Sequence, residues 1–276
     1  MGAVGSLVTL LTAVLFYLGW ASSDAESRAL GLQDSLFHLS TSDYLLRSVQ
    51  ALFLPAWLIT GAALAAAGLH RWATREPSRT ELVSQRLRFA WLPPLALLLF
   101  YRLQPELFDL VIPLAAIIGF LLTTYARTRP LAAAASETTG ISDVEKRHRQ
   151  RLWVLTLMVS VLLLFWAVYA YAGVVGRGRA AETARTVATD LPAVVVFSEE
   201  DLMIRGGGSC YFRVQDKDSA YGFRYSGLRL FHIAGDRVYV VPVHWRPYEG
   251  TLWVLEKSDT LRVEYISGAA GKAEQC

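Results

Sequence analysis

Residues 152–176 read LWVLTLMVSVLLLFWAVYAYAGVVG, an apolar run without a single charged side chain. The hydrocarbon core of a bilayer is about 30 Å thick, and a helix needs about 20 apolar residues to cross it. This run is therefore predicted to form a transmembrane helix. It is the longest of its kind in the chain and sets the class of the whole protein.

Shorter apolar blocks precede this run, and together they predict helices at 3–21, 49–69, 89–103, 107–126 and 152–176. A chain of 276 residues could not bury five such blocks inside a soluble core. The composition agrees, because 53% of the residues are hydrophobic and only 18% are charged, whereas soluble domains carry about 25% charged residues. We therefore expect an integral membrane protein, which argues against a disordered chain and against an ordinary soluble enzyme.

Two of the blocks leave alternatives open. Pro93 and Pro94 bend the short third block, so residues 89–126 form either two full spans or a re-entrant hairpin. The first block is either an uncleaved helix or a signal peptide, and the lack of a basic segment before it favours the helix.

Basic residues gather in two of the connections between the blocks. Residues 70–88 and 127–151 hold eleven Lys and Arg, whereas the other two connections hold only Arg28, Arg47 and Arg102. Loops rich in Lys and Arg stay in the cytoplasm. We expect a cytoplasmic amino terminus and an extracytoplasmic segment after residue 176. Since topology accounts for the basic residues, the lipid bilayer is the expected partner and nucleic acid is not.

The composition changes after residue 176. Residues 177–189 are small and polar, and we interpret them as a linker or a helix extension. From residue 190 to 276 the apolar residues alternate with polar ones, which is typical of strands. The predicted strands are 193–197, 211–215, 222–225, 228–232, 237–242, 251–255 and 261–266. The expected fold class is thus a membrane all-α bundle in residues 1–176, followed by a small C-terminal antiparallel β domain.

The tail holds both cysteines of the chain, Cys210 and Cys276. In an oxidising extracytoplasmic space they could form a disulfide, and two separate thiols are the alternative. With two cysteines and no paired histidines, no metal site is expected, and no motif predicts a cofactor.

A catalytic role in the tail would require Ser209 or Cys210 beside His232 or His244. The sequence contains neither a Gly-x-Ser-x-Gly elbow nor a His-Glu-x-x-His helix. The glycines at 206–208 could cradle a phosphate, but they lack the Lys and the helix of a P-loop and are interpreted as a turn. The predicted partner contacts are instead exposed aromatic residues of the tail: Tyr221, Phe223, Tyr225, Trp245 and Tyr248.

The leading functional hypothesis is a membrane anchor that presents an extracytoplasmic binding or interaction module, its partner being another membrane or cell-surface protein. A small-solute transporter or channel, with the β domain as a lid, is the first alternative. The apolar runs themselves, 3–21, 49–69, 89–101, 110–126 and 152–176, contain no Asp, Glu, Lys or Arg, which counts against ion-coupled transport. A membrane-tethered hydrolase is the second alternative.

Three stretches carry a resemblance: FYLGW at 16–20, STSDYLLRS at 40–48 and YGFRY at 221–225. In these the chain resembles multi-pass integral membrane proteins of high-GC Gram-positive (actinobacterial) type, a group whose function is not established. The resemblance implies a plasma-membrane setting and assigns no role to any residue.

Overall fold

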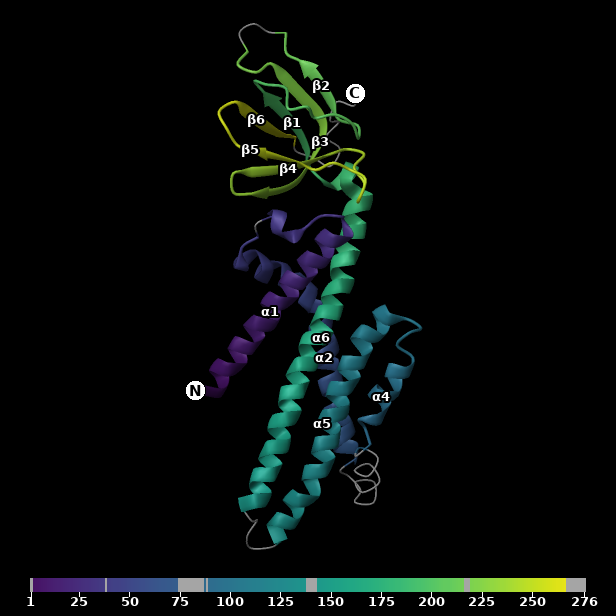
Figure 1. Cartoon of the computed structure of the whole chain (residues 1–276). Coiled ribbons are helices and arrows are strands. Elements are labelled where there is room, and N and C mark those ends of the chain that lie inside the picture. Colours follow the sequence, from purple (N-terminus) through teal and green to yellow (C-terminus); the bar gives the residue numbers. More distant parts are fainter. Residues whose placement is uncertain are drawn as a thin grey trace. The chain divides into compact units, whose positions relative to one another are not determined.

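The computed structural model describes residues 2–37, 39–73, 87, 89–137, 143–215 and 219–266. The chain divides into two compact units, which we call the helical unit (1–19 and 45–173) and the sheet unit (20–44 and 174–276). The elements, labelled as in Figure 1, are α1 (Gly2–Ala29), the 3-10 turn η1 (Asp34–Phe37), α2 (Thr41–Ala73), α4 (Leu92–Leu99), α5 (Pro105–Glu137), α6 (Asp143–Asp190), β1 (Ala193–Ser198), β2 (Cys210–Arg213), β3 (Phe223–Ala234), β4 (Arg237–Pro242), β5 (Trp253–Glu256) and β6 (Leu261–Ile266).

Three helical stretches within the described residues are long and apolar enough to cross a membrane: Val8–Ala29, Pro105–Ala126 and Arg147–Asp190. Helix α2 becomes a fourth if its two halves form one span, since it bends by 47° between Phe53 and Pro55. A proline inside a helix removes one backbone donor and clashes with the preceding turn, which explains a bend at this point. The expected count of five spans is therefore not confirmed.

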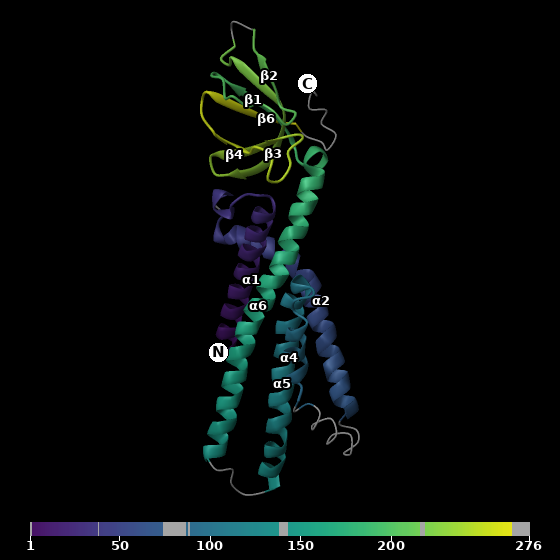
Figure 2. The same cartoon turned by 45° about the vertical axis from the view of Figure 1, so that its right-hand side comes forward.

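The predicted helix at 89–103 is the one that fails. Only α4 is helical there, and its eight residues extend about 12 Å, well short of a bilayer core. Pro93 and Pro94 lie in its first turn, where they start a helix rather than continue one. Helix α4 packs alongside α5 (Figures 1 and 2), and a Cβ atom at Gly119 would lie 2.4 Å from the carbonyl oxygen of Ala90. This geometry matches the hairpin alternative better than two full spans.

The remaining helices of the helical unit are joined by a few polar and aromatic contacts. The Tyr171 hydroxyl of α6 donates to the carbonyl oxygen of Ala51 in α2 at 2.8 Å. The hydroxyls of Thr124 in α5 and Thr156 in α6 lie 2.8 Å apart. Successive helices of this unit run in opposite directions, so α1 and α6 run the same way and α2 and α5 run against them (Figure 2).

The sheet of the sheet unit is antiparallel, with the strand order β5-β4-β3-β1-β6. Strand β2 pairs with the first residues of β3, and β4 pairs with the second half of β3. The predicted strands 193–197, 237–242 and 261–266 agree with β1, β4 and β6 to within one residue. The predicted break between the strands 222–225 and 228–232 is wrong, because β3 continues through Ser226 and Gly227. Ser226 and Gly227 both lie opposite the single residue Val195 of β1, and Gly227 adopts a φ of +71°. This pairing of two residues with one is a β-bulge.

The central strands β1, β3 and β4 are buried on both faces over most of their length, which explains the almost continuous apolar sequence of β1. On one face Val194, Tyr225 and Val240 pack under Ile204. On the other face Val241 and Trp245 pack against Leu30 at the end of α1 and against Ala180 and Val187 of α6.

The structure decides the role of two chain segments. Residues 177–189, predicted as a linker or a helix extension, are the last turns of α6, which is the second alternative, and they cover the sheet. Residues 20–44, which the sequence assigned to the membrane domain, belong to the sheet unit. A Cβ atom at Gly176 would lie 2.4 Å from the carbonyl oxygen of Ser22, so α1 and α6 approach backbone to backbone there.

The buried Arg229 of β3 is held at the end of α6. Its guanidinium Nη1 donates to the carbonyl oxygen of Leu191 at 3.2 Å, one residue past the helix. A cation is favourable at the negative end of a helix dipole. This contact gives the arginine a structural role.

Candidate functional site

The structure separates the five predicted contact aromatics. Tyr225 and Trp245 are buried core residues and do not form an exposed contact surface, which corrects the expectation that they are exposed. Tyr221 and Phe223 are half-buried. Tyr248 is 76% exposed. The prediction assumed a sheet with one solvated face, and helical segments cover that face instead.

Tyr225 braces the segment that follows β1. Its hydroxyl donates to Asp201 Oδ1 at 2.6 Å and accepts the backbone N–H of Leu202 at 2.8 Å. The hydrogen bond from Tyr225 lowers the pKa of Asp201, and burial, followed by the bond to Asp201, raises the pKa of Tyr225. Asp201 also accepts from Arg205 Nη2 at 2.8 Å. These contacts fix the segment that leads into the glycines at 206–208.

Tyr248 lies in the turn between β4 and β5, with its backbone at a φ of +65°. Its hydroxyl donates to the carbonyl oxygen of Arg28 at 2.7 Å. A Cβ atom at Gly31 would lie 2.9 Å from Tyr248 Cδ1, so a glycine is needed there. The exposed tyrosine thus holds its own turn against the end of α1.

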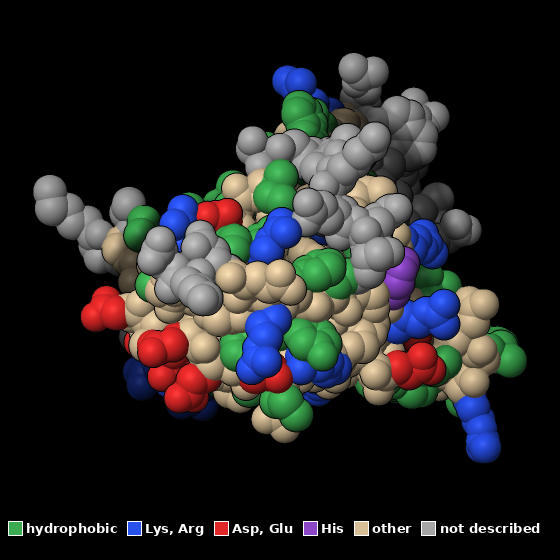
Figure 3. All heavy atoms as spheres, turned by 90° about the horizontal axis from the view of Figure 1, so that it is seen from above, with side chains coloured by type: hydrophobic (Ala, Val, Ile, Leu, Met, Phe, Trp, Pro, Cys, Tyr) green, Lys and Arg blue, Asp and Glu red, His purple; other side chains and the backbone are tan. Residues whose placement is uncertain are grey.

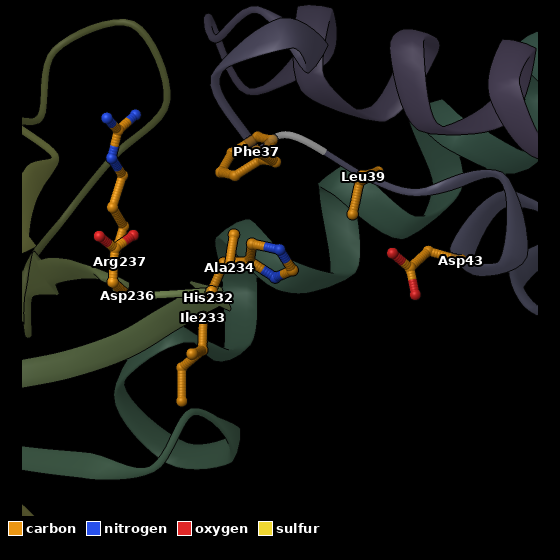
Figure 4. A pocket seen from close by; sticks show the side chains of 9 residues that line it. Phe37, Leu39, Asp43, His232, Ile233, Ala234, Asp236 and Arg237 are labelled. Carbon is orange, nitrogen blue, oxygen red and sulfur yellow. The ribbon is translucent and has the colours of Figure 1, made fainter.

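One open cleft of about 500 Å³ lies between residues 37–43 and the β3–β4 hairpin; we call it the hairpin cleft. Figure 4 shows Phe37, Leu39 and Asp43 on one side and His232, Asp236 and Arg237 on the hairpin.

Most polar groups of the hairpin cleft are engaged in the fold. Asp43 Oδ2 accepts the backbone N–H of Ser40 at 2.8 Å, as a helix cap. Arg237 pairs with Glu256 at 3.5 Å. The His232 ring lies edge-on against Phe37, with 5.3 Å between the ring centroids. We interpret this cleft as the boundary along which Phe37, Leu39 and Asp43 lie against the sheet.

A second cleft, of about 390 Å³, lies beside the glycine turn; we call it the glycine cleft. Its lining includes Arg205, Gly206, His244, Trp245, Arg246 and Glu249. His244 and Arg246 are exposed, and neither side chain makes a hydrogen bond or ion pair with any described residue. The Arg246 guanidinium and the His244 imidazole are therefore available to a ligand.

Sequence reasoning missed this arrangement, although its signal was present. It considered the glycines at 206–208 without the arginine directly before them, and it treated His244 only as a catalytic candidate. Residues 205–207 and 244–246 come together because the backbone N–H of His244 donates to the carbonyl oxygen of Gly207 at 2.9 Å. Figure 3 shows basic and acidic side chains interspersed on the face seen from above. A ligand site in a cleft therefore fits this face better than a binding surface of a single charge sign.

The hydrolase alternative gains no support from Ser209, whose hydroxyl donates to the carbonyl oxygen of Gly206 at 2.7 Å. Within the described ranges no three His, Cys, Asp or Glu side chains are grouped to hold a metal ion. Cys210 is buried and is not a free thiol. Cys276 lies outside the described residues, so the bridge between the two stays a prediction.

Comparisons with protein-family models, with curated proteins and with solved structures found no match for the chain.

Proposed function

We propose that the chain is a membrane-anchored binding protein of a bacterial plasma membrane. Its helical unit is the anchor, and its sheet unit is extracytoplasmic and binds a ligand in the glycine cleft. The resemblance to multi-pass membrane proteins of actinobacterial type supports the plasma-membrane setting.

The helix directions and the basic residues support this orientation. The basic stretches 70–88 and 127–151 follow the apolar parts of α2 and α5, which run against α1 and α6. If these stretches stay in the cytoplasm, the carboxyl ends of α1 and α6 are outside. The short α4 does not change this result, because α5 returns the chain to the side that α4 left.

The observation that carries the binding function is the glycine cleft itself. The central strands of the sheet are covered on both faces, which favours a ligand site at an edge or in a cleft. Of the two clefts described above, only the glycine cleft exposes cationic side chains that the fold does not use. Sites of this kind are concave and have a few convergent polar groups.

A cleft-filling substitution tests the proposal. Thr251 is exposed and lines the glycine cleft, so Thr251→Trp would occlude it. Thr260→Trp is the matched control, since Thr260 is exposed in the turn before β6 and outside the cleft.

Thermal unfolding of the full-length protein is measured against charged and neutral envelope fragments and small metabolites. A ligand at one hundred times its Kd stabilises the folded state by about 2.7 kcal/mol. We expect at least one compound to stabilise the parent and Thr260→Trp, but not Thr251→Trp. If no compound distinguishes the two variants, the binding function is wrong.

A further inference from the structure

Building on the proposed function, we propose that the glycine cleft binds a phosphate group. The basic side chains that frame the cleft differ in how they are held. Arg205 is fixed in place, because its Nη2 donates to Asp201 at 2.8 Å and its guanidinium carbon lies 3.6 Å from the centroid of the Tyr211 ring. Arg246 and His244 are exposed and unpaired within the described part of the chain. A guanidinium held in a fixed orientation matches the geometry of phosphate oxygens.

The backbone of the turn adds a second element. Gly206, Gly207 and Gly208 have φ values of +90°, +62° and +86°, a run that only glycines adopt readily. Cβ atoms would lie 2.5 Å from Pro242 Cγ at Gly207 and 2.6 Å from His244 Cδ2 at Gly208. A Cβ at Gly206 would meet nothing within 4 Å. The turn is thus packed against His244 on one side and stays open at Gly206, which lines the cleft.

A buried donor in the cleft wall is a third, independent observation. Trp245 is only 3% exposed, and its indole Nε1 has no hydrogen-bond partner. A buried N–H without a partner costs free energy that an acceptor oxygen would recover. The Nε1 edge of the ring lies against Gly250, which also lines the cleft, and a Cβ atom there would lie 2.6 Å from Nε1. An oxygen would therefore reach this donor only when Gly250 moves away from the ring.

The charges of the lining show which group an anion would depend on. Arg205 is already paired with Asp201, which leaves Arg246 and a single lining acid, Glu249. Arg246 would therefore carry the attraction for an anion, and His244 adds a further nitrogen donor or acceptor. A phosphate offers oxygens in several directions, which suits donors that come from the 205–207 and 244–246 segments. Soluble phosphates, phosphodiester polymers of the envelope and lipid headgroups all share this chemistry.

The test uses the full-length protein in nanodiscs of phosphatidylcholine, with inorganic pyrophosphate and glycerol phosphate as probes in calorimetric titrations. Arg246→Gln removes one unpaired cation of the cleft. Arg262→Gln is the matched control, because Arg262 lies on β6, outside the cleft lining, and pairs with the half-buried Glu264. A charge-assisted hydrogen bond changes affinity by about tenfold or more. We expect Arg246→Gln to weaken binding of at least one probe by that factor and Arg262→Gln to leave it unchanged.

Nanodiscs that contain phosphatidylglycerol identify the source of the phosphate. If phosphatidylglycerol competes with the probes, the site binds a lipid headgroup. If it does not compete, the site binds a soluble or polymeric phosphate. Absence of binding by both probes, or equal affinities in the two variants, would overturn the inference. If a neutral compound still stabilises the parent but not Thr251→Trp, the binding function stands and only the phosphate assignment falls.

Discussion

Replacing Phe37 by alanine removes the side chain through which residues 34–37 dock on the sheet. The Phe37 ring is 7% exposed and lies 5.7 Å from the Phe231 ring and 5.4 Å from the Tyr239 ring, centroid to centroid. Phe→Ala substitutions in cores cost about 3–5 kcal/mol. The hairpin cleft borders this site, so the gap can be partly filled, and we expect the lower end, about 3 kcal/mol.

Hydrogen–deuterium exchange of the full-length protein measures this loss locally. Amide protection reports the free energy of local opening, and about 3 kcal/mol corresponds to roughly 100-fold faster exchange. The faster exchange is expected in residues 34–37 and on the facing part of β3 and β4.

The neighbouring Leu36→Ala is the matched control. The Leu36 side chain is 40% exposed, and the carbonyl oxygen that accepts from the Tyr239 hydroxyl belongs to the backbone and remains. We expect little change in its exchange. If Phe37→Ala and Leu36→Ala exchange alike, residues 34–37 do not dock through Phe37 and this part of the sheet unit is wrongly described.

The remaining predictions concern packing and pH. Gly250→Ala should lower the melting temperature, because its Cβ would lie 2.2 Å from Trp245 Cδ1; an unchanged value would refute the close approach. Gly178→Ala should raise it, by about 0.5–1 kcal/mol of stability, since a Cβ there meets nothing within 4 Å on helix α6. The lowered pKa of Asp201 means that the Tyr225 hydrogen bond stabilises the fold above the ordinary value of 3.8 and is lost as the pH falls through the lowered pKa. The free energy of unfolding should therefore fall less on acidification in Tyr225→Phe than in the parent.

The fold of the sheet unit was largely readable because its strands are local patterns. Strands β4 and β6 have the predicted bounds, and β1 extends one residue further. The bulge at Gly227 was misread as a break between two strands, since a glycine after a serine is compatible with either feature and only the pairing with β1 decides between them. The third apolar block was misread because its hydropathy is high, whereas Pro93 and Pro94 limit the helix that it forms.

The site was much less predictable, because it depends on contacts between distant parts of the chain. The burial of Trp245 follows from its packing with Leu30 and Ala180. No periodicity within residues 190–276 indicates that α1 and α6 supply this cover. The glycine cleft likewise needs the pairing of Gly207 with His244, 37 positions later in the sequence. The arginine–glycine run at 205–208 was visible, but its cationic partners were not.

The most direct test of the central claim, that the sheet unit is extracytoplasmic, uses two native lysines. Lys257 is exposed in the turn after β5, and Lys146 lies in the basic stretch 127–151. Intact cells are treated with a membrane-impermeant amine reagent, and both positions are read by mass spectrometry before and after permeabilisation. We predict that Lys257 is modified on intact cells and Lys146 only after permeabilisation. The reverse pattern would place the sheet unit in the cytoplasm and contradict the account.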